Sequence, residues 1–551
     1  MDSTKSISRS TLAGIVLCAL AMSVGWGFRG DYGHEAGAMV PGALLGLSIC
    51  LASGRPDWWR RSSIMAMCGA VGWAFGGQMS YGLITGYTAS SSLPDVVYGY
   101  ASLFVIGGLW AGIGSAVLAL SVTKPRSYLE RFAGPLVVLW ITWLIMDLSG
   151  LTVWMVEKWY LNDTDWFAAL SALVVAGIYA LAVPRSRTAC GLIIVIAGGW
   201  WVGYALLTGL LGLHMTPPRS DNWSGCVGLY IALVVYLIRQ DDRAALKLAL
   251  YGFFIGGIGF ALGDFVNMLG RAQWGLIRHY QALQGLDYWK WMEQLFGLVM
   301  GLGIGLAFLR YVRPKLASAT PAPASSDASR GGGEDDNGGK PRPYAKGEGK
   351  MNIVALLFLL LVMTWSNLFK NVRNWAKGDN IPEHFFGLRT EWWFLLVGLM
   401  LSAIVLVAII RYHRQVLPLA PSSAFGRGQL LFLIILWVAI AGAFMQAFPV
   451  MTNKGVFFVH VTFWLTGAIC SLLVLSLPGT PKLLCEGGPG TSEPHTEQQL
   501  TPSDSYWRLG KKYWLIWLVI PIVILLIAYL TVASHDEQLP GSHLRFVTTG
   551  R

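Results

Sequence analysis

Charged residues are scarce in this sequence: of its 551 residues, only 13% are Asp, Glu, Lys or Arg. An ordinary soluble domain carries about 25% charged residues. Hydrophobic residues make up 54% of the chain and arrive in long blocks. This composition excludes a soluble globular protein and indicates a lipid bilayer as the solvent and first partner of the chain.

Cysteine is scarce as well, and the seven residues show no paired spacing: Cys18, Cys50, Cys68, Cys190, Cys226, Cys470 and Cys485. A disulfide framework or a zinc finger needs closely spaced pairs. The His-Glu-x-x-His pattern of a zinc helix is also missing. We therefore expect the cysteines to be small packing residues, and we predict no metal and no cofactor.

Motifs of soluble catalytic domains are absent too. The sequence has no P-loop and no Gly-x-Ser-x-Gly elbow, which argues against an ATP-driven transporter in this single chain. In a soluble protein, a net charge of +11 would suggest that the protein binds nucleic acid. Because the basic residues lie in the connections between apolar blocks, we predict no nucleic-acid partner.

The apolar blocks are long enough to cross a membrane as helices, which takes roughly 20 residues each. They predict an all-α, polytopic transmembrane helix bundle of about fifteen spans. The blocks cover residues 11–28, 38–54, 62–86, 98–122, 133–154, 166–184, 189–213, 223–238, 245–269, 293–311, 351–370, 391–411, 427–450, 456–477 and 513–533.

The distribution of basic residues predicts the orientation of the chain. Most of the 41 Lys and Arg residues fall on the side of the N-terminus, as Arg55, Arg60 and Arg61 do. Positively charged connections stay in the cytoplasm, so the N-terminus is expected inside and the C-terminus outside. The first block lacks a clear cleavage site and is read as a retained span. A multi-pass protein of a bacterial cytoplasmic (inner) membrane fits these features.

Two polar stretches rich in Pro, Gly and charge divide the chain, and both are typical of disordered linkers. The predicted organisation is a ten-span membrane domain (1–316), a cytoplasmic linker (317–350), a four-span membrane domain (351–477), a second cytoplasmic linker (478–511), and a last span with an outer tail (512–551).

Glycine patterns recur at a nearly constant spacing in the first domain. The sequence Gly-Trp-Ala-Phe-Gly at 72–76 matches 259–263, and the Gly-rich stretch at 108–114 matches 297–303. These matches predict a parallel internal repeat, with spans 1–4 repeated as spans 7–10. Membrane helices rich in small residues also resemble one another for packing reasons, which is the alternative.

Four ionisable residues crowd the short connection between the first two spans: Arg29, Asp31, His34 and Glu35. Ionisable groups at membrane depth are candidates for function. This group would bind a charged solute, relay protons through His34, or supply an acid and a base. The alternative is a structural network of Arg and carboxylates that only closes the loop.

Other polar residues lie toward the predicted outer ends of spans. Gln78 with Tyr81, and Asp264 with Asn267, are each three residues apart, which places each pair on one helix face. Asp147 is the remaining carboxylate within a span. We predict one polar cavity open to the extracytoplasmic side, with binding or proton-relay residues Arg29, Asp31, His34, Glu35, Gln78, Tyr81, Asp147, Asp264 and Asn267. The alternative for each residue is a hydrogen-bonded position within the bundle.

These features lead to a secondary-type transporter or solute-binding membrane protein. The connection at 270–292 mixes aromatic and basic residues and suits a segment that lies in the membrane interface, as a lid or an anchor. It also suits a first alternative, a membrane-embedded enzyme that uses a lipid-linked sugar or acyl donor. A membrane scaffold or sensor subunit is the second alternative. The expected partner is a small solute or a lipid-linked substrate, and no catalytic residue is assigned.

Overall fold

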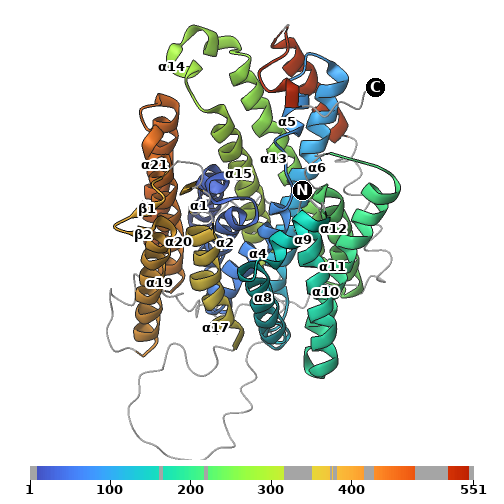
Figure 1. Cartoon of the computed structure of the whole chain (residues 1–551), viewed down its shortest axis with the longest axis vertical. Coiled ribbons are helices and arrows are strands. Elements are labelled where there is room, and N and C mark those ends of the chain that lie inside the picture. Colours follow the sequence, from blue (N-terminus) through green and yellow to red (C-terminus); the bar gives the residue numbers. More distant parts are fainter. Residues whose placement is uncertain are drawn as a thin grey trace, which may run out of the picture.

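The described part of the chain folds as a bundle of helices with a short β-hairpin (Figure 1). The computed structural model describes residues 9–159, 165–215, 221–314, 350–370, 372, 375–376, 381–414, 427–477, 519–535 and 537–544. Within these ranges, 13 helices are long and apolar enough to cross a membrane. The prediction of a helical chain with many membrane-length helices is confirmed, whereas the exact number of spans stays a prediction.

The first predicted domain contains most of the helices. They are α1 (Arg9–Arg29), α2 (Glu35–Ala52), α3 (Pro56–Arg60), α4 (Ser62–Gly77), α5 (Ile84–Thr88), α6 (Leu93–Thr123), α7 (Arg126–Glu130), α8 (Ala133–Leu148), α9 (Leu151–Trp159), α10 (Asp165–Ala182), α11 (Arg187–Gly203), α12 (Asn222–Arg239), α13 (Arg243–Arg271), α14 (Gln281–Gln284) and α15 (Tyr288–Leu306). Helices α11 and α15 continue as π-helical stretches, Tyr204–Leu210 and Ala307–Val312.

The second part contains α17 (Lys350–Leu357), the π-helical stretches Phe358–Val362 and Trp365–Lys370, strands β1 (His384–Phe385) and β2 (Leu388–Arg389), α19 (Thr390–Arg414), α20 (Arg427–Ala447) and α21 (Lys454–Ser476). The two strands form an antiparallel hairpin. A last helix covers Val519–Ala533. Apart from Lys350, both predicted linkers, 317–350 and 478–511, lie outside the described residues.

The third predicted span is not one continuous helix, so the prediction of an unbroken 62–86 span is wrong. Helix α4 ends at Gly77, and a non-helical stretch at 78–83 separates it from α5. Glycine has low helix propensity, and Gly77 lies against the start of α2, where an added Cβ would come within 2.6 Å of the Glu35 Cα. Contact between the two chain segments therefore coincides with the break.

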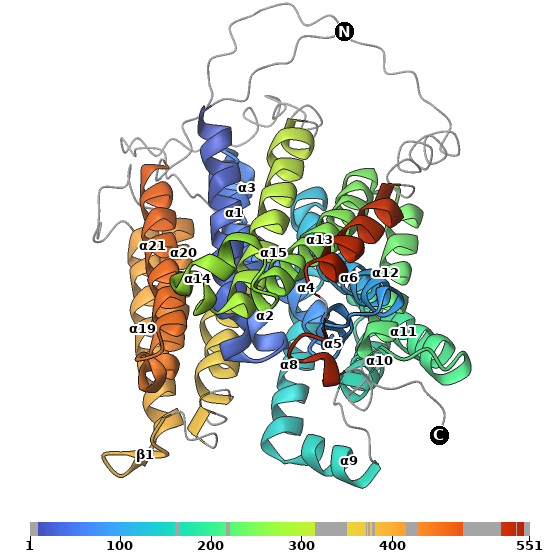
Figure 2. The same cartoon turned by 90° about the horizontal axis from the view of Figure 1, so that it is seen from above.

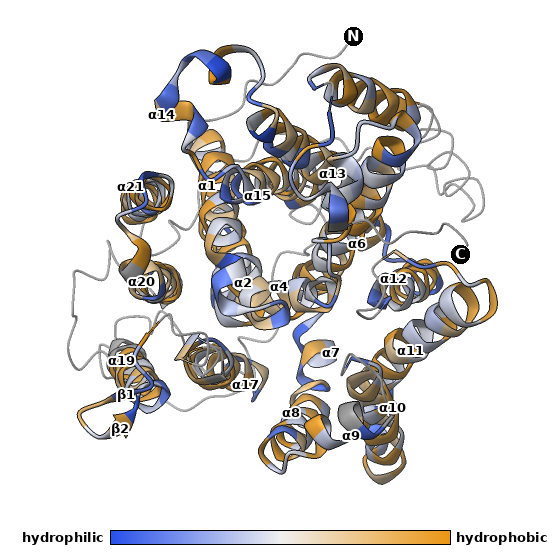
Figure 3. Cartoon of the chain, turned by 45° about the horizontal axis from the view of Figure 1, so that its top comes forward, coloured by the Kyte–Doolittle hydropathy of each residue, from blue (hydrophilic) through white to orange (hydrophobic). Residues whose placement is uncertain are grey.

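Six helices form a closed ring at the centre of the molecule: α1, α2, α4, α6, α13 and α15. Each contacts the next, and α15 returns to α1, as the view down the bundle in Figure 3 shows. Helices from the two ends of the first predicted domain thus lie side by side.

Small residues allow the ring helices to approach closely. A Cβ on Gly69 of α4 would lie 2.1 Å from the Gly42 carbonyl oxygen of α2. A Cβ on Gly256 of α13 would lie 2.2 Å from the Gly107 carbonyl oxygen of α6. Backbones are in contact at both crossings, as small residues permit in membrane helices.

Aromatic side chains fill the interior of the ring. Trp26 and Trp110 meet edge to face with centroids 4.7 Å apart, and Phe260 and Phe296 stack at 4.6 Å. The Trp110 indole also donates a hydrogen bond of 3.0 Å to the Trp73 carbonyl oxygen. All five side chains are buried, so packed aromatic rings occupy the middle of the ring.

Two groups of helices flank the ring on different sides. Helices α10, α11 and α12 pack in succession beside α6, and α17, α20 and α21 pack against α4, α2 and α1 (Figure 2). The last helix lies against α6 and α13, where the Tyr100 hydroxyl bonds the Thr531 hydroxyl at 2.7 Å. The predicted four-span domain is therefore in contact with the first one.

The predicted internal repeat concerns the helix pairs α4–α6 and α13–α15, and both pairs are neighbours in the ring. The matched glycines also lie in comparable places. A Cβ on Gly72 would meet Gly114 of α6, and a Cβ on Gly259 would meet Val299 of α15. The duplication itself stays a prediction.

A buried hydrogen bond joins the turn after α1 to α20, and its loss gives a first testable expectation. Tyr32 is buried, and its hydroxyl donates to the Ala439 carbonyl oxygen at 2.5 Å. Tyr32→Phe leaves this carbonyl without its donor and is expected to lower the free energy of unfolding by about 1 kcal/mol, measured by denaturation in mixed micelles. The exposed Tyr280 is the matched control, and Tyr280→Phe is expected to change nothing measurable. Equal effects of both variants would contradict the role of this contact.

Candidate functional site

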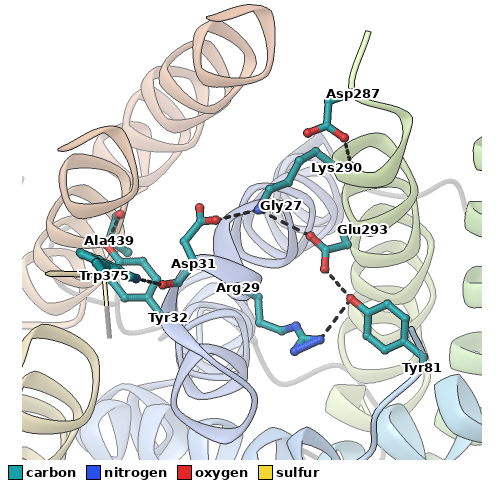
Figure 4. A network of polar contacts seen from close by, with 10 residues as sticks. All are labelled: Gly27, Arg29, Asp31, Tyr32, Tyr81, Asp287, Lys290, Glu293, Trp375 and Ala439. Carbon is teal, nitrogen blue, oxygen red and sulfur yellow. Dashed lines mark hydrogen bonds and ion pairs between the residues drawn. The ribbon is translucent and has the colours of Figure 1, made fainter. Parts of the chain in front are cut away.

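A network of charged side chains lies where α1, α15 and the break after α4 meet (Figure 4). Arg29 is the last residue of α1, and Asp31 follows it in a 3-10 turn, Gly30–Tyr32. Lys290 and Glu293 lie in the first turns of α15. Tyr81 belongs to the non-helical stretch between α4 and α5. The interruption between α4 and α5 thus places the Tyr81 phenol between the charged end of α1 and the charged start of α15.

The start of α15 sets the positions of Lys290 and Glu293. The Asp287 side chain caps the helix by accepting a hydrogen bond from the Lys290 backbone N–H at 3.2 Å. An Asp at this position favours a helix start because it satisfies a backbone donor that has no partner within the helix. Lys290 and Glu293 are then three residues apart on one helix face.

Tyr81 links the two most deeply buried charged residues of this network, Arg29 and Glu293. Its hydroxyl donates to Glu293 Oε1 at 2.5 Å and accepts from Arg29 Nη2 at 3.2 Å. The phenol therefore stands between the guanidinium and the carboxylate, whose charges do not touch directly.

Lys290 forms the outer part of the network. Its Nζ is 2.9 Å from Asp31 Oδ1 and donates to the Gly27 carbonyl oxygen at 3.0 Å. Glu293 Oε2 is more distant from the same Nζ, at 3.8 Å. Lys290 and Asp31 are partly exposed whereas Glu293 is buried, so the Lys290–Asp31 ion pair lies nearer the surface.

Arg29 is a buried cation surrounded by aromatic faces. Only 2% of the residue is exposed, and its guanidinium carbon lies 5.2, 5.4 and 5.0 Å from the ring centres of Trp26, Tyr81 and Trp110. Among the described residues, no carboxylate lies within 4.0 Å of it. Aromatic faces and the C-terminal end of α1 both favour a positive charge.

Several buried polar atoms in this region have no hydrogen-bond partner among the described residues: Arg29 Nε, Glu293 Oε2, Trp26 Nε1 and Gln294 Nε2. Most buried polar groups in proteins are paired, so each exception calls for an explanation. The set contains three donors and one carboxylate acceptor, and it belongs to the facing helices α1 and α15. It presents hydrogen-bonding capacity for a polar ligand.

The predicted four-span domain (351–477) contacts the same network. The Trp375 indole donates to the Asp31 carbonyl oxygen at 2.7 Å, and Thr462 of α21 lies 3.4 Å from Gln294. Phe463 of α21 approaches Gly27, where an added Cβ would meet its ring. The four-span part of the chain therefore helps to build the surroundings of the site.

Sequence reasoning identified part of this network. Arg29, Asp31 and Tyr81 were predicted and lie within it. Lys290 and Glu293 were not among the predicted site residues. The available signal was the Lys and Glu spacing of three residues at the beginning of an apolar block.

His34 and Glu35 lie at the other end of the same connection. His34 precedes α2 and is exposed, and Glu35 is the first residue of α2 and is partly buried. Neither is joined to Arg29 or Glu293 by a contact described here. A role for them in binding or proton relay stays a prediction.

Gln78 and Asp147 lie in other surroundings. The Gln78 side-chain oxygen Oε1 accepts a hydrogen bond from the Trp200 indole at 3.1 Å. The Gln78 backbone carbonyl oxygen accepts from the Asn222 side chain, which also donates to the Asp165 carboxylate. Asp147 lies near the end of α8, a helix whose contacts are with α9, α10 and α17. Helix α8 therefore lies outside the ring.

Asp264 and Asn267 form a third, separate cluster within α13. Asn267 Nδ2 donates to Asp264 Oδ1 at 3.0 Å, and both residues are buried. The structure thus distributes the nine predicted residues over several places and does not gather them in one cavity. One physical reason is the break after Gly77, because it releases Gln78 and Tyr81 from a common helix face and lets them point to different neighbours.

Within the described ranges, no three or more His, Cys, Asp or Glu side chains are grouped as a metal site would require. The chain matches no protein-family model, no curated protein and no solved structure.

Proposed function

We propose that this membrane protein is a secondary-type transporter or solute-binding protein, and that it takes a small polar solute with an anionic group at the Arg29–Tyr81–Glu293 network. The observation that supports this most directly is Arg29. A guanidinium that is 2% exposed, with no described carboxylate within 4.0 Å, has capacity left for an anion.

The partner groups refine the solute chemistry. Glu293 Oε2 has no hydrogen-bond partner among the described residues and would accept from a hydroxyl or amine of the same solute. Trp26 Nε1 and Gln294 Nε2 would donate to its oxygens. A solute with an anionic group and a donor group several atoms apart satisfies both ends of the set.

The backbone around the site also fits solute handling. Solute sites in transporters often lie where a membrane helix is interrupted, and Tyr81 lies in the interruption between α4 and α5. The aromatic core formed by Trp73, Trp110 and Phe296 lies directly inward of Arg29 in the ring. Passage of a solute across the membrane would require these rings to separate.

An enzyme acting on a lipid-linked substrate is the alternative that a specific observation favours. In the connection between α13 and α15, the side chains of Trp274, Leu276 and Tyr280 are exposed. Apolar and aromatic side chains of this kind bind to the interfacial region of a bilayer. The same connection leads into Lys290 and Glu293, so a lipid headgroup held there would reach the network.

Native mass spectrometry of the protein in nanodiscs tests the proposal. The wild-type protein is expected to retain a small polar solute, and Glu293→Gln is expected to lose it, because the uncharged amide no longer matches a donor group of the solute. The matched control is Glu130→Gln, which removes an exposed carboxylate paired with Arg126 at 2.6 Å and is expected to retain the solute.

The identity of the retained molecule separates the two functions. A small soluble compound lost only from Glu293→Gln supports solute binding, and its uptake into proteoliposomes then tests transport. A polyprenyl- or acyl-linked donor lost from the same variant supports the enzyme. Retention of the same molecule by both variants would show that the network is not the binding site.

A further inference from the structure

We propose a second site, separate from the solute site, in which Asp264 and Asn267 of α13 and Thr88 of α5 bind a monovalent metal cation of the Na⁺ type. The proposal does not depend on the solute site. In a secondary transporter this cation would be the coupling ion.

The first observation is a buried carboxylate without a cation. Asp264 is fully buried, and among the described residues no Lys, Arg or His lies within 4.0 Å of it. Arg271, the last residue of α13, donates to the Pro540 carbonyl oxygen at 2.9 Å and lies over the Trp289 ring. An ionised carboxylate in a medium of low dielectric constant is very unfavourable unless a cation is paired with it.

The second observation is a pair of buried side-chain oxygens that accept no hydrogen bond from the described residues. Asp264 Oδ2 and Asn267 Oδ1 have no hydrogen-bond partner among the described residues. The Thr88 hydroxyl interacts with the Asp264 carboxyl and also donates to the Thr85 carbonyl oxygen at 3.0 Å. Two buried oxygens of neighbouring side chains on α13 therefore keep unused lone pairs, which a bound cation would occupy favourably.

The position of the cluster adds a third observation. Thr88 ends α5, the short helix that follows the break in the third predicted span. Interrupted helices supply cation ligands in membrane transporters because they release oxygens from the regular hydrogen-bond ladder. The proposed solute site therefore uses Tyr81 from the non-helical stretch, and the proposed cation site uses Thr88 from the end of α5.

The last helix, Val519–Ala533, and the residues after it pack near the cluster. The Tyr100 and Thr531 hydroxyls bond each other at 2.7 Å, and both residues are buried. Beyond this helix, the Leu539 backbone N–H donates to the Ala89 carbonyl oxygen at 3.0 Å. The C-terminal segment therefore contacts α6 and the residue directly after Thr88.

The charge of the site selects the cation. One carboxylate neutralises one positive charge, so a divalent ion would leave a net charge in the protein interior. Ca²⁺ and Mg²⁺ also bind sites with more carboxylates or several retained waters. Neutral oxygens around a single carboxylate fit a monovalent ion.

Thermal unfolding of the full-length protein in nanodiscs tests the site. NaCl replaces choline chloride at constant ionic strength and constant pH. The Tm of the wild-type protein is expected to rise with Na⁺ concentration and then level off, as binding to the folded state requires. Asp264→Asn is expected to lose most of this rise. The matched control Asp57→Asn, at the partly exposed Arg55 pair, is expected to keep it.

Thr88→Val gives an independent measurement if Asp264→Asn does not fold. This variant keeps the carboxylate and the side-chain volume but removes one oxygen, so its Tm rise should need at least several-fold more Na⁺. Absence of any Na⁺ dependence in the wild-type protein would overturn the proposal. So would an unchanged Na⁺ response in Asp264→Asn, or a Tm that follows pH but not Na⁺, because a proton would then occupy the site.

Discussion

Glu293→Leu is expected to lower the free energy of unfolding by about 3–5 kcal/mol, the range found when one partner of a buried charge network is removed. The substitution takes away the acceptor of the Tyr81 hydroxyl and one of the two carboxylates near Lys290. Arg29 then stays buried with one less negative charge in its surroundings. Denaturation in mixed micelles, followed by tryptophan fluorescence, measures the change.

A double-mutant cycle with Arg29→Met shows whether the loss comes from charge imbalance. If the guanidinium and the carboxylate stabilise each other through Tyr81, the double variant should be markedly more stable than the sum of the two single losses predicts. Additive losses would show that Arg29 and Glu293 act independently. Glu293→Gln keeps an acceptor for Tyr81 and should therefore lose less stability than Glu293→Leu.

Gly256→Leu is expected to prevent assembly of the ring. An added Cβ at this position would lie 2.2 Å from the Gly107 carbonyl oxygen and 2.5 Å from the Ala111 Cβ. Because the first of these atoms belongs to the backbone, the two helices would have to move apart, at a cost above the usual 1–3 kcal/mol of overpacking. Size-exclusion chromatography with fluorescence detection should show a loss of most of the monodisperse protein.

The matched control is Gly177→Leu in α10, where an added Cβ would meet nothing within 4 Å. This substitution should leave the chromatographic peak unchanged, because side chains that face open space or lipid are tolerated. A normal peak for Gly256→Leu would mean that the crossing of α6 and α13 is looser than the described contacts indicate.

The helices were the most predictable part of the fold. A bilayer requires long apolar segments, so hydrophobicity alone located the 13 membrane-length helices. The interruption after α4 was not predictable in this way. It coincides with the contact between Gly77 and the first residue of α2, and residues 62–86 carry no charge that would mark the break.

Of the candidate site, the sequence predicted the residues near the end of α1 but not their partners on α15. The sequence around Arg29 is unusual by itself, because it places four ionisable residues in a short connection. Its partners are distant: 212 residues separate Tyr81 from Glu293, and 259 separate Asp31 from Lys290. No periodicity within one helix reports which other helix end will lie opposite, so the pairing of Lys290 and Glu293 with the end of α1 could be found only from the closed ring.

The closure of the ring by α1 and α15 has a consequence for biosynthesis. Lys290 binds the Gly27 carbonyl oxygen, a contact that spans 263 residues. At a translation rate of about 5–20 residues per second, this interval lasts tens of seconds. During that time α1 is already in or near the membrane while its charged partners do not yet exist. A nascent chain in this state must hold Arg29 at the lipid headgroups, where a long basic side chain is solvated, and draw it inward only when α15 emerges from the ribosome.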